Sequence, residues 1–226
     1  MQFTYYGHSC FSVKAGGKTL LFDPFVTGNP LASAINVDEI AADYIFVSHG
    51  HYDHTTDVVR IAKRTGAKVL GNWELYDWFN KNGLKNTHPI NPGGQFEFDF
   101  GKVKSVTAIH SSSLADGTYA GTACGFVIRS MDGCFYYSGD TGLTIDMQLI
   151  LGWAQPDFAV LPIGDDLTMG VDDAIKAADW LGVKSIVGVH YDTFGFIKID
   201  HKKATDTFNA AGLALHLPAI GSTIDL

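Results

Sequence analysis

The feature that most constrains this chain is a cluster of metal-ligating side chains directly after an apolar run. The run "YIFVS" leads into "HGHYDH", residues 49–54, which holds three histidines and one aspartate. A short apolar run of this kind is typical of a buried strand. Side chains two residues apart on an extended segment point the same way, so we expect His49 and His51 to share a pocket. Asp53 and His54 follow where the chain turns towards a helix, and they can point back into that pocket. Imidazole and carboxylate ligands together suit zinc, iron or manganese.

Three further candidate ligands lie at the C-terminal ends of apolar segments. His110 ends "VKSVTAIH", Asp140 ends "CFYYSGD", and His190 ends "SIVGVH". Loops that follow strand ends are where α/β proteins usually place their chemistry. With the motif, these residues give five histidines and two aspartates, enough for two metal ions with a position open for water. One histidine at a strand end arises easily by chance, whereas the whole set does not.

Length, composition and charge bound the class of protein. The 226 residues suit one domain, residues 1–226, better than two small ones. The net charge of −8, without any cluster of Lys or Arg, argues against nucleic acid or an anionic membrane as the main partner. No apolar run is long enough for a bilayer, and the N-terminus shows no secretory signal. Three scattered cysteines without a CxxC pair are expected in the reducing cytoplasm.

The order of the expected elements predicts a mixed α/β protein. Strand-like segments dominate residues 3–23 and 95–139, whereas strands alternate with helices over residues 44–82 and 143–217. The expected helices cover residues 55–65, 73–82, 143–151, 171–181 and 201–211, and the last expected strand covers residues 213–217. Because both kinds of segment occur in one chain, we predict two sheets flanked by helices within one domain.

These motifs resemble those of the metallo-β-lactamase-fold hydrolases. The motif "HGHYDH", the lone His110, Asp140 in "SGDTG" and His190 in "GVHYDTF" follow the order of that superfamily over the whole chain. The segments "GHSCF", "DPFVTGNP" and "TMG" are most similar to short bacterial and archaeal metal-dependent hydrolases related to the ascorbate-6-phosphate lactonases. The resemblance implies a four-layer αβ/βα sandwich with the site at one edge, between its two halves.

The resemblance also implies a ligand set for two divalent metal ions. One ion would be held by His49, His51 and His110, and the other by Asp53, His54 and His190, with Asp140 bridging both. Zinc is the usual metal, and manganese, nickel or iron occurs in some members. Two such ions would share a water molecule and lower its pKa towards about 7, giving a hydroxide that cleaves an ester, lactone, amide or phosphodiester bond of a small-molecule substrate. We expect Asp53 to be a ligand with an added role in proton transfer.

Several other polar residues have both a functional and a structural interpretation. His8, after "YYG", either hydrogen-bonds a ligand as part of the catalytic site or is a satisfied structural histidine. Asp23 is interpreted chiefly as the cap of the turn at Pro24, with orientation of a metal-bound imidazole as the alternative. Thr168 is interpreted chiefly as part of a helix cap, with pocket lining as the alternative. Three histidines are predicted to be structural or surface residues: His88, His201 and His216. An aromatic group at helical spacing is predicted to pack in the core: Trp73, Tyr76, Trp78 and Phe79.

Other functions remain compatible with parts of the pattern. An iron-dependent redox enzyme similar to the persulfide dioxygenases would keep the same histidines. His51 stands where iron oxygen-reducing relatives typically have Glu, which favours hydrolysis. A small nuclease or phosphodiesterase would need a basic surface, and a non-enzymatic module would leave no open metal position.

The sequence departs from the relatives' pattern at a few positions that bear on the pocket lining: Thr55-Thr56, Asp165, Asp166 and Asp192. The sequence does not specify the substrate, and it is compatible with a monomer or a homo-oligomer.

Overall fold

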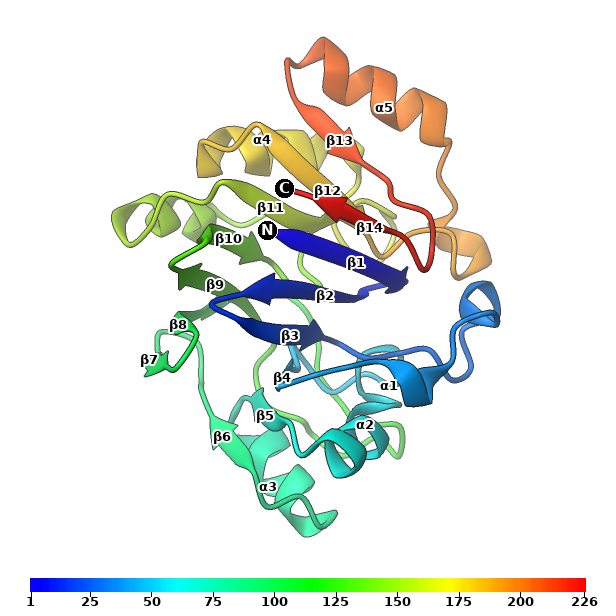
Figure 1. Cartoon of the computed structure of the whole chain (residues 1–226). Coiled ribbons are helices and arrows are strands. Elements are labelled where there is room, and N and C mark those ends of the chain that lie inside the picture. Colours follow the sequence, from blue (N-terminus) through cyan, green and yellow to red (C-terminus); the bar gives the residue numbers. More distant parts are fainter.

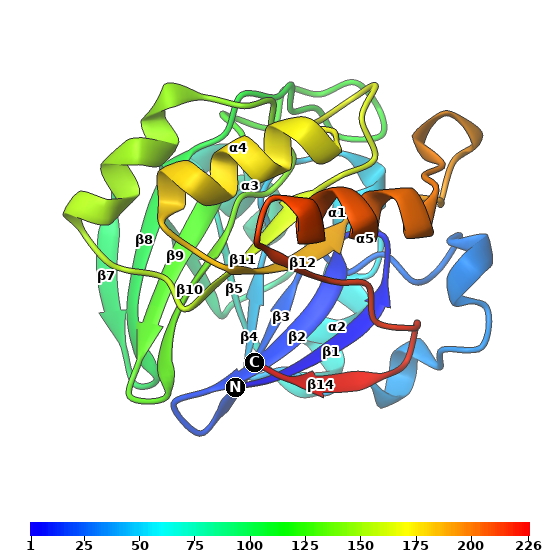
Figure 2. The same ribbon diagram turned by 90° about the horizontal axis from the view of Figure 1, so that it is seen from above.

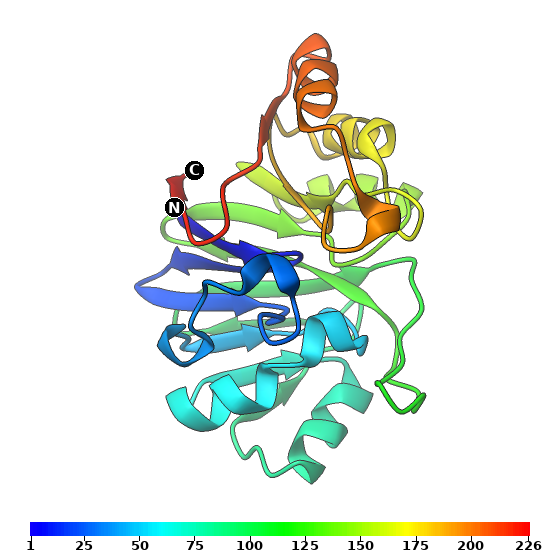
Figure 3. The same ribbon diagram turned by 90° about the vertical axis from the view of Figure 1, so that its right-hand side faces the viewer.

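The computed structural model describes all 226 residues, which form two seven-stranded β-sheets packed face to face. The first sheet has the order β14 (Thr223–Asp225), β1 (Gln2–Gly7), β2 (Cys10–Ala15), β3 (Lys18–Phe22), β4 (Tyr44–Phe46), β5 (Lys68–Gly71), β6 (Thr87–Pro89). The second has the order β13 (Ala214–His216), β12 (Ser185–Val189), β11 (Phe158–Pro162), β10 (Gly133–Tyr137), β9 (Cys124–Ser130), β8 (Gly101–Thr107), β7 (Gln95–Phe98). Helices cover both outer faces, so the layers run helix, sheet, sheet, helix (Figure 3). This confirms the predicted four-layer α/β sandwich.

The helices divide between the two sheets. Beside the first sheet lie α1 (Tyr52–Thr55), α2 (Val58–Thr65) and α3 (Trp73–Lys81), and α4 (Val171–Leu181) and α5 (His201–Ala210) cover the second (Figures 1 and 2). Four segments between these elements are 3₁₀-helical: η1 (Pro30–Ala32), η2 (Val37–Glu39), η3 (Ile145–Gly152) and η4 (Gly195–Ile197). Gly66 caps the C-terminus of α2 and Gly182 that of α4, both with left-handed backbone at φ 74° and 65°.

Each sheet is antiparallel on one side and parallel on the other. In the first sheet the pairs from β14 to β3 are antiparallel and those from β3 to β6 are parallel. In the second, β7 to β10 are antiparallel and β10 to β13 parallel. The parallel strands are covered on both faces, which explains why a segment such as "FAVLP" is apolar at every position and fully buried.

A ladder of phenylalanines crosses the inner face of the first sheet. Phe3, Phe11, Phe22 and Phe46 come from four adjacent strands, and their rings stack with centroids 4.8, 4.7 and 4.7 Å apart. Phe22 also meets Phe135 of the second sheet edge-on at 5.7 Å. Aromatic stacking across strands of one sheet and edge contacts to the other stabilise a single core between the sheets.

Two backbone hydrogen bonds join the sheets at one edge. The His190 amide, just after β12, donates to the carbonyl of His8, just after β1, at 3.0 Å. The Cys124 amide at the start of β9 donates to the carbonyl of Ser48, beyond β4, also at 3.0 Å. Segments far apart in the sequence are therefore held together where the candidate ligands leave their strands.

Some elements differ from the sequence-based expectation. The segment expected as a helix over 143–151 is the 3₁₀ turn η3, and β13 is not the last strand, because β14 follows it and pairs with β1. Neither β14 nor β6 was expected. Each has only three residues, and their pairing is decided by neighbours distant in the sequence. None of the helices has the length and apolar character needed to cross a bilayer.

Replacing Phe22 with alanine tests the phenylalanine ladder. Phe22 is 0% exposed and touches rings of both sheets, so we expect Phe22→Ala to lower the free energy of unfolding by about 3–5 kcal/mol. Phe96→Ala is the matched control. Phe96 is 47% exposed, and we expect a loss below about 1 kcal/mol. Urea denaturation measures both, and equal losses in the two variants would contradict the assignment of the core.

Candidate metal centre

The "HGHYDH" motif lies where β4 leads through an extended segment into α1. His49 is fully buried, and His51 is half-buried as the residue before the helix, with φ −60° and ψ 149°. The short helix then brings Asp53 and His54 back beside them, both buried. Gly50 separates the first two histidines, and a Cβ at this position would lie 2.2 Å from the Cβ of Ala120. The close packing of the loop after His110 therefore requires glycine here.

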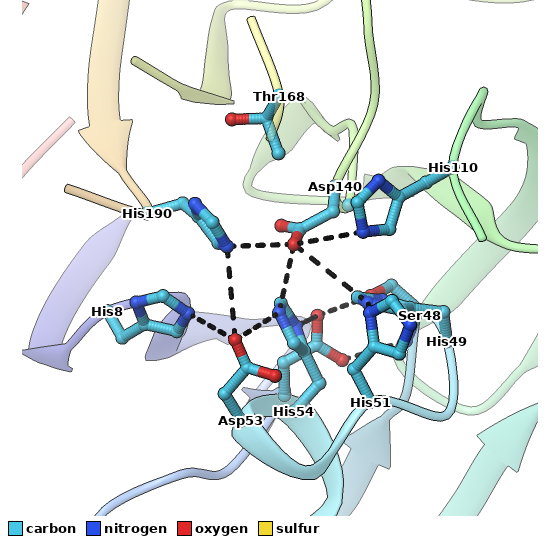
Figure 4. Close-up of polar contacts among 12 residues, drawn as sticks. His8, Ser48, His49, His51, Asp53, His54, His110, Asp140, Thr168 and His190 are labelled. Atoms are coloured by element: carbon cyan, nitrogen blue, oxygen red, sulfur yellow. Dashed lines mark hydrogen bonds and ion pairs between the residues drawn. The ribbon is translucent and has the colours of Figure 1, made fainter. Parts of the chain in front are cut away.

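The three distant candidates reach the same place from the second sheet. His110 follows β8, Asp140 follows β10, and His190 follows β12 (Figure 4). Oδ2 of Asp140 lies 2.9 Å from Nε2 of His190 and 3.1 Å from Nε2 of His54. Nε2 of His110 and Nε2 of His49 are 3.8 and 3.9 Å from the same oxygen. The structure thus brings all seven predicted ligands together, with Asp140 at their centre.

The ligand atoms gather in overlapping groups whose members lie within 4.8 Å of one another. One group comprises His49, His51 and His110, and another comprises His8, Asp53, His54 and His190. A third, His49, His54 and Asp140, joins the first two. This division agrees with the two ligand sets implied by the resemblance, apart from the additional His8.

Hydrogen bonds outside the cluster fix which ring nitrogen faces inwards. The Ser48 hydroxyl donates to Oδ2 of Asp23 at 2.6 Å, so its oxygen accepts from Nδ1 of His49 at 2.9 Å. Nδ1 of His54 donates to the same Asp23 oxygen at 2.9 Å. Both imidazoles therefore turn Nε2 towards Asp140, and partners of this kind raise the basicity of the inward nitrogen.

The interpretation of Asp23 chiefly as a turn cap is wrong. Its carboxylate is fully buried and also accepts from the Ser48 amide at 2.7 Å and from the Tyr137 hydroxyl at 2.5 Å. Its hydrogen bonds go to His54, to Ser48 and to Tyr137 of the second sheet, so Asp23 orients the imidazole of His54. The signal was present in the sequence, because Asp23 ends an apolar strand in the same context as Asp140.

His8 is a direct partner of a predicted ligand. Its Nε2 lies 3.0 Å from Oδ2 of Asp53, and its Nδ1 lies 3.0 Å from the hydroxyl of Thr193. Burial, with a smaller contribution from His190, lowers the pKa of His8 to about 4, so the ring is neutral at pH 7 and carries one proton. An ionised carboxylate can only accept. The proton therefore sits on Nε2, and Nδ1 accepts from Thr193, a residue that the sequence reasoning missed.

The centre concentrates negative charge without lysine or arginine. Asp23, Asp53 and Asp140 are all buried, and their ion-pair partners are histidines. Burial opposes the charging of His54, but Asp140, Asp23 and Asp53 raise its pKa well above the usual value. Burial likewise opposes the ionisation of Asp140, and the imidazoles of His190 and His54 nevertheless hold its pKa well below the usual range. Such a site needs additional positive charge.

A family model described as a beta-lactamase superfamily domain matches residues 2–190. The chain belongs to the metallo-β-lactamase superfamily. A UPF0173 metal-dependent hydrolase of Flavobacterium johnsoniae is 48% identical over 226 residues, covering 100% of both chains. The structure of Igni18, a metallo hydrolase of the archaeon Ignicoccus hospitalis, is similar with a TM-score of 0.88 and 31% identity, over 99% of this chain and 97% of that one. An isothiocyanate hydrolase from Delia radicum gut bacteria shares the fold, with a TM-score of 0.82 and 20% identity over 100% and 99% of the two chains. The protein is thus a metal-dependent hydrolase of this superfamily, as predicted.

The buried donor atoms of this hydrolase fit a divalent cation. Oδ1 of Asp140 is buried without a hydrogen-bond partner, and buried Nε2 of His54 forms no hydrogen bond beyond its ion-pair contact with Oδ2 of Asp140 at 3.1 Å. Nε2 of His49 and Nδ1 of His51 face each other at 2.9 Å, with lone pairs that a metal ion could bind in place of a shared proton. Imidazole nitrogens with carboxylate oxygens form the donor set of zinc sites, and a cation would balance the surplus negative charge.

Backbone strain gathers at the same place. His8, Asp23 and His190 have positive φ values of 56°, 41° and 56°, which non-glycine residues rarely adopt. Such conformations persist where the surrounding structure enforces them, and they occur preferentially at functional sites. All three residues follow directly after strands β1, β3 and β12, so the strain turns their side chains into the space between the sheets.

The remaining singled-out residues lie outside the ligand set. Thr168 does not cap α4, whose N-cap is Gly170, and it lies beyond Asp140 as seen from Asp53 (Figure 4). The predicted structural histidines sit elsewhere: His88 on β6, His201 paired with Asp192 at 2.6 Å, and His216 bonded to Ser185 at 3.0 Å. The aromatic group on α3 was predicted to be core, but only Phe79 is buried and Trp73 is 56% exposed.

Asp23→Asn tests the orienting role of Asp23. The amide keeps the size of the side chain but loses the charge that holds Nδ1–H of His54, so we expect metal affinity to fall by about 10- to 100-fold. Competition with a chromogenic chelator measures this affinity. Asp57→Asn is the matched control. Asp57 is also buried and accepts hydrogen bonds from two backbone amides, at 2.7 and 2.8 Å, but neither bond involves a candidate ligand. An equal loss of affinity in both variants would show a general folding defect instead.

Proposed function

We propose that this hydrolase holds two divalent metal ions, with zinc as the expected metal, and cleaves an ester, lactone or phosphodiester bond of a small substrate. The position of Asp140 carries the proposal, because one carboxylate oxygen lies between Nε2 atoms of four histidines at 2.9–3.9 Å. A carboxylate placed between two groups of nitrogen donors suits a bridging ligand. The ions would be held by His49, His51 and His110 on one side and by Asp53, His54 and His190 on the other.

Bound ions of this kind polarise a carbonyl or phosphoryl oxygen and lower the pKa of water. The chain determines where water and substrate enter. His49, His54, His190 and Asp140 are sealed from solvent, whereas His51 and the side chains of His110 (13% exposed) and Asp53 (12%) reach it. Substrate must therefore approach over these three residues.

Asp53 is the carboxylate best placed to move a proton. Burial opposes its ionisation, but the charge of His54 and the hydrogen bond from His8 keep its pKa well below the usual range, so it is ionised at neutral pH. The hydrogen bond from His8 engages Oδ2 and fixes the orientation of the carboxylate. Asp140 is more deeply buried and has four imidazoles around one oxygen, which leaves it a structural role as a ligand.

Metal analysis of the purified protein tests the number and identity of the ions. We expect two zinc equivalents per chain by mass spectrometry, and about one in His51→Ala, because that variant removes one donor from the group with His49 and His110. Turnover of ester, lactone or phosphodiester substrates should fall with it. His88→Ala, on β6 and outside the cluster, should keep both ions and full turnover. Protein that contains iron and consumes oxygen with a sulfur substrate would contradict hydrolysis.

The role of Asp53 in proton transfer has its own test. Asp53→Asn keeps an acceptor for His8 but cannot take up a proton, so we expect kcat to fall by about 10²–10⁴-fold, even in samples that retain both ions. Exposed Asp206→Asn, on α5, is the control and should be unaffected. Full turnover in Asp53→Asn at normal metal content would show that Asp53 does not transfer the proton.

A further inference from the structure

Aromatic side chains that bind no metal stand at the entrance of the site. Tyr52 lies between His51 and Asp53 in the sequence, yet it is 51% exposed and rests edge-on against buried Phe25 at 5.7 Å. Phe194, on the loop after β12, lies 6.4 Å from Tyr52 and 5.4 Å from His8 by ring centroids. Phe196 stacks on Phe194 at 5.7 Å and is 57% exposed. These three residues, Tyr52, Phe194 and Phe196, are called the aromatic wall below.

The aromatic wall belongs to the proposed path of the substrate. It adjoins His8 through Phe194 and, through Tyr52, the chain at Asp53, whose side chain is 12% exposed. Exposed apolar side chains also lie next to His110 and Thr168 in the sequence, since Ile109 is 58% and Leu167 50% exposed. Exposed apolar surface around a few convergent polar groups is characteristic of small-molecule sites.

The entrance offers no cation to an anionic substrate. Lysine and arginine are absent from the five segments 24–36, 48–57, 108–122, 138–145 and 163–170. The sixth segment, 190–200, has only Lys198, which lines a separate cavity of about 400 Å³ shared with Asp172, Asp173 and Asp200. The same segments add acidic residues outside that cavity: Asp116, Asp166 and Asp192, the last paired with His201 at 2.6 Å. A phosphate or carboxylate on the substrate would meet negative charge and no partner.

We propose that the site selects uncharged substrates with an aromatic or similarly flat apolar group, which packs on the aromatic wall while the scissile bond lies at the metal centre. This selectivity rests on the proposed function and narrows it to neutral esters or lactones, away from phosphodiesters and sugar phosphates. Hydrolysis of such an ester breaks one C–O bond, consumes one water and yields an alcohol, a carboxylate and a proton. The acidic entrance favours departure of that anionic product.

Three hydroxamates with the same metal-binding group test the selectivity without turnover. Isothermal calorimetry on the zinc-loaded protein compares acetohydroxamate, benzohydroxamate and 4-carboxybenzohydroxamate. We expect benzohydroxamate to bind about tenfold more tightly than acetohydroxamate, because its ring covers apolar surface. The added carboxylate should remove most of that gain. In Tyr52→Ala, Phe194→Ala and Phe196→Ala the ratio between the first two dissociation constants should shrink, whereas Phe96→Ala, an exposed phenylalanine on β7, should keep it.

The outcomes separate this proposal from the proposed function. Failure to hydrolyse a panel of neutral and anionic esters would refute hydrolysis of these bonds, and the binding ratios would still decide the selectivity. Equal or tighter binding of the carboxylated probe, no binding of any probe, or an unchanged ratio in all three wall variants would overturn the selectivity. Faster turnover of a carboxylated or phosphorylated ester than of its neutral counterpart would overturn it as well. Phe196→Ala is the most informative of the three variants. Its ring contacts the ring of Phe194 and not His8 or a candidate ligand, so its loss tests the aromatic wall without changing a contact of the metal centre.

Discussion

Three carboxylates buried among imidazoles impose the main constraint on this structure. Asp23, Asp53 and Asp140 carry negative charge in a region that contains no lysine or arginine partner for them. Buried charge is costly unless it is paired, so the fold must hold the histidines against these carboxylates or leave the charge uncompensated. The hydrogen bonds that join the sheets beside His8 and Ser48 meet this requirement, because they bring the ends of strands from both sheets to one place.

Asp23 connects that charge to the hydrophobic core. It accepts from His54 in the site and from the hydroxyl of Tyr137, whose ring meets Phe11 and Phe22 edge-on at 5.0 and 5.6 Å. The orientation of a candidate ligand therefore depends on the packing between the sheets. This coupling explains how side chains from loops can hold a fixed geometry, because His8, Asp23 and His190 follow a strand directly and His49, His110 and Asp140 lie three residues after one.

The sequence was most informative where the chemistry is local. The "HGHYDH" motif and the strand-end positions of His110, Asp140 and His190 predicted the cluster, because α/β proteins usually place their chemistry in loops that follow strand ends. The contact of Asp23 with Tyr137 and the role of Thr193 could not be derived in this way. Tyr137 is 114 residues from Asp23, and Thr193 is 185 residues from His8, so those contacts exist only once the sheets have packed. The short strands β6 and β14 were missed for the same reason, since their pairing is not encoded in their own residues.

The division of charge between the centre and its entrance has a consequence for recognition. Positive charge brought in by two divalent ions would largely be balanced by the three buried carboxylates, which leaves enough to stabilise negative charge that develops during bond cleavage. A permanent anion on the substrate would need a further cation, and the entrance supplies aromatic rings and carboxylates instead. Binding energy at the entrance must then come from apolar contact, which is non-directional and tolerates variation in the alcohol or acid portion. Such a site discriminates strongly between charge states and weakly between neutral substrates of similar shape.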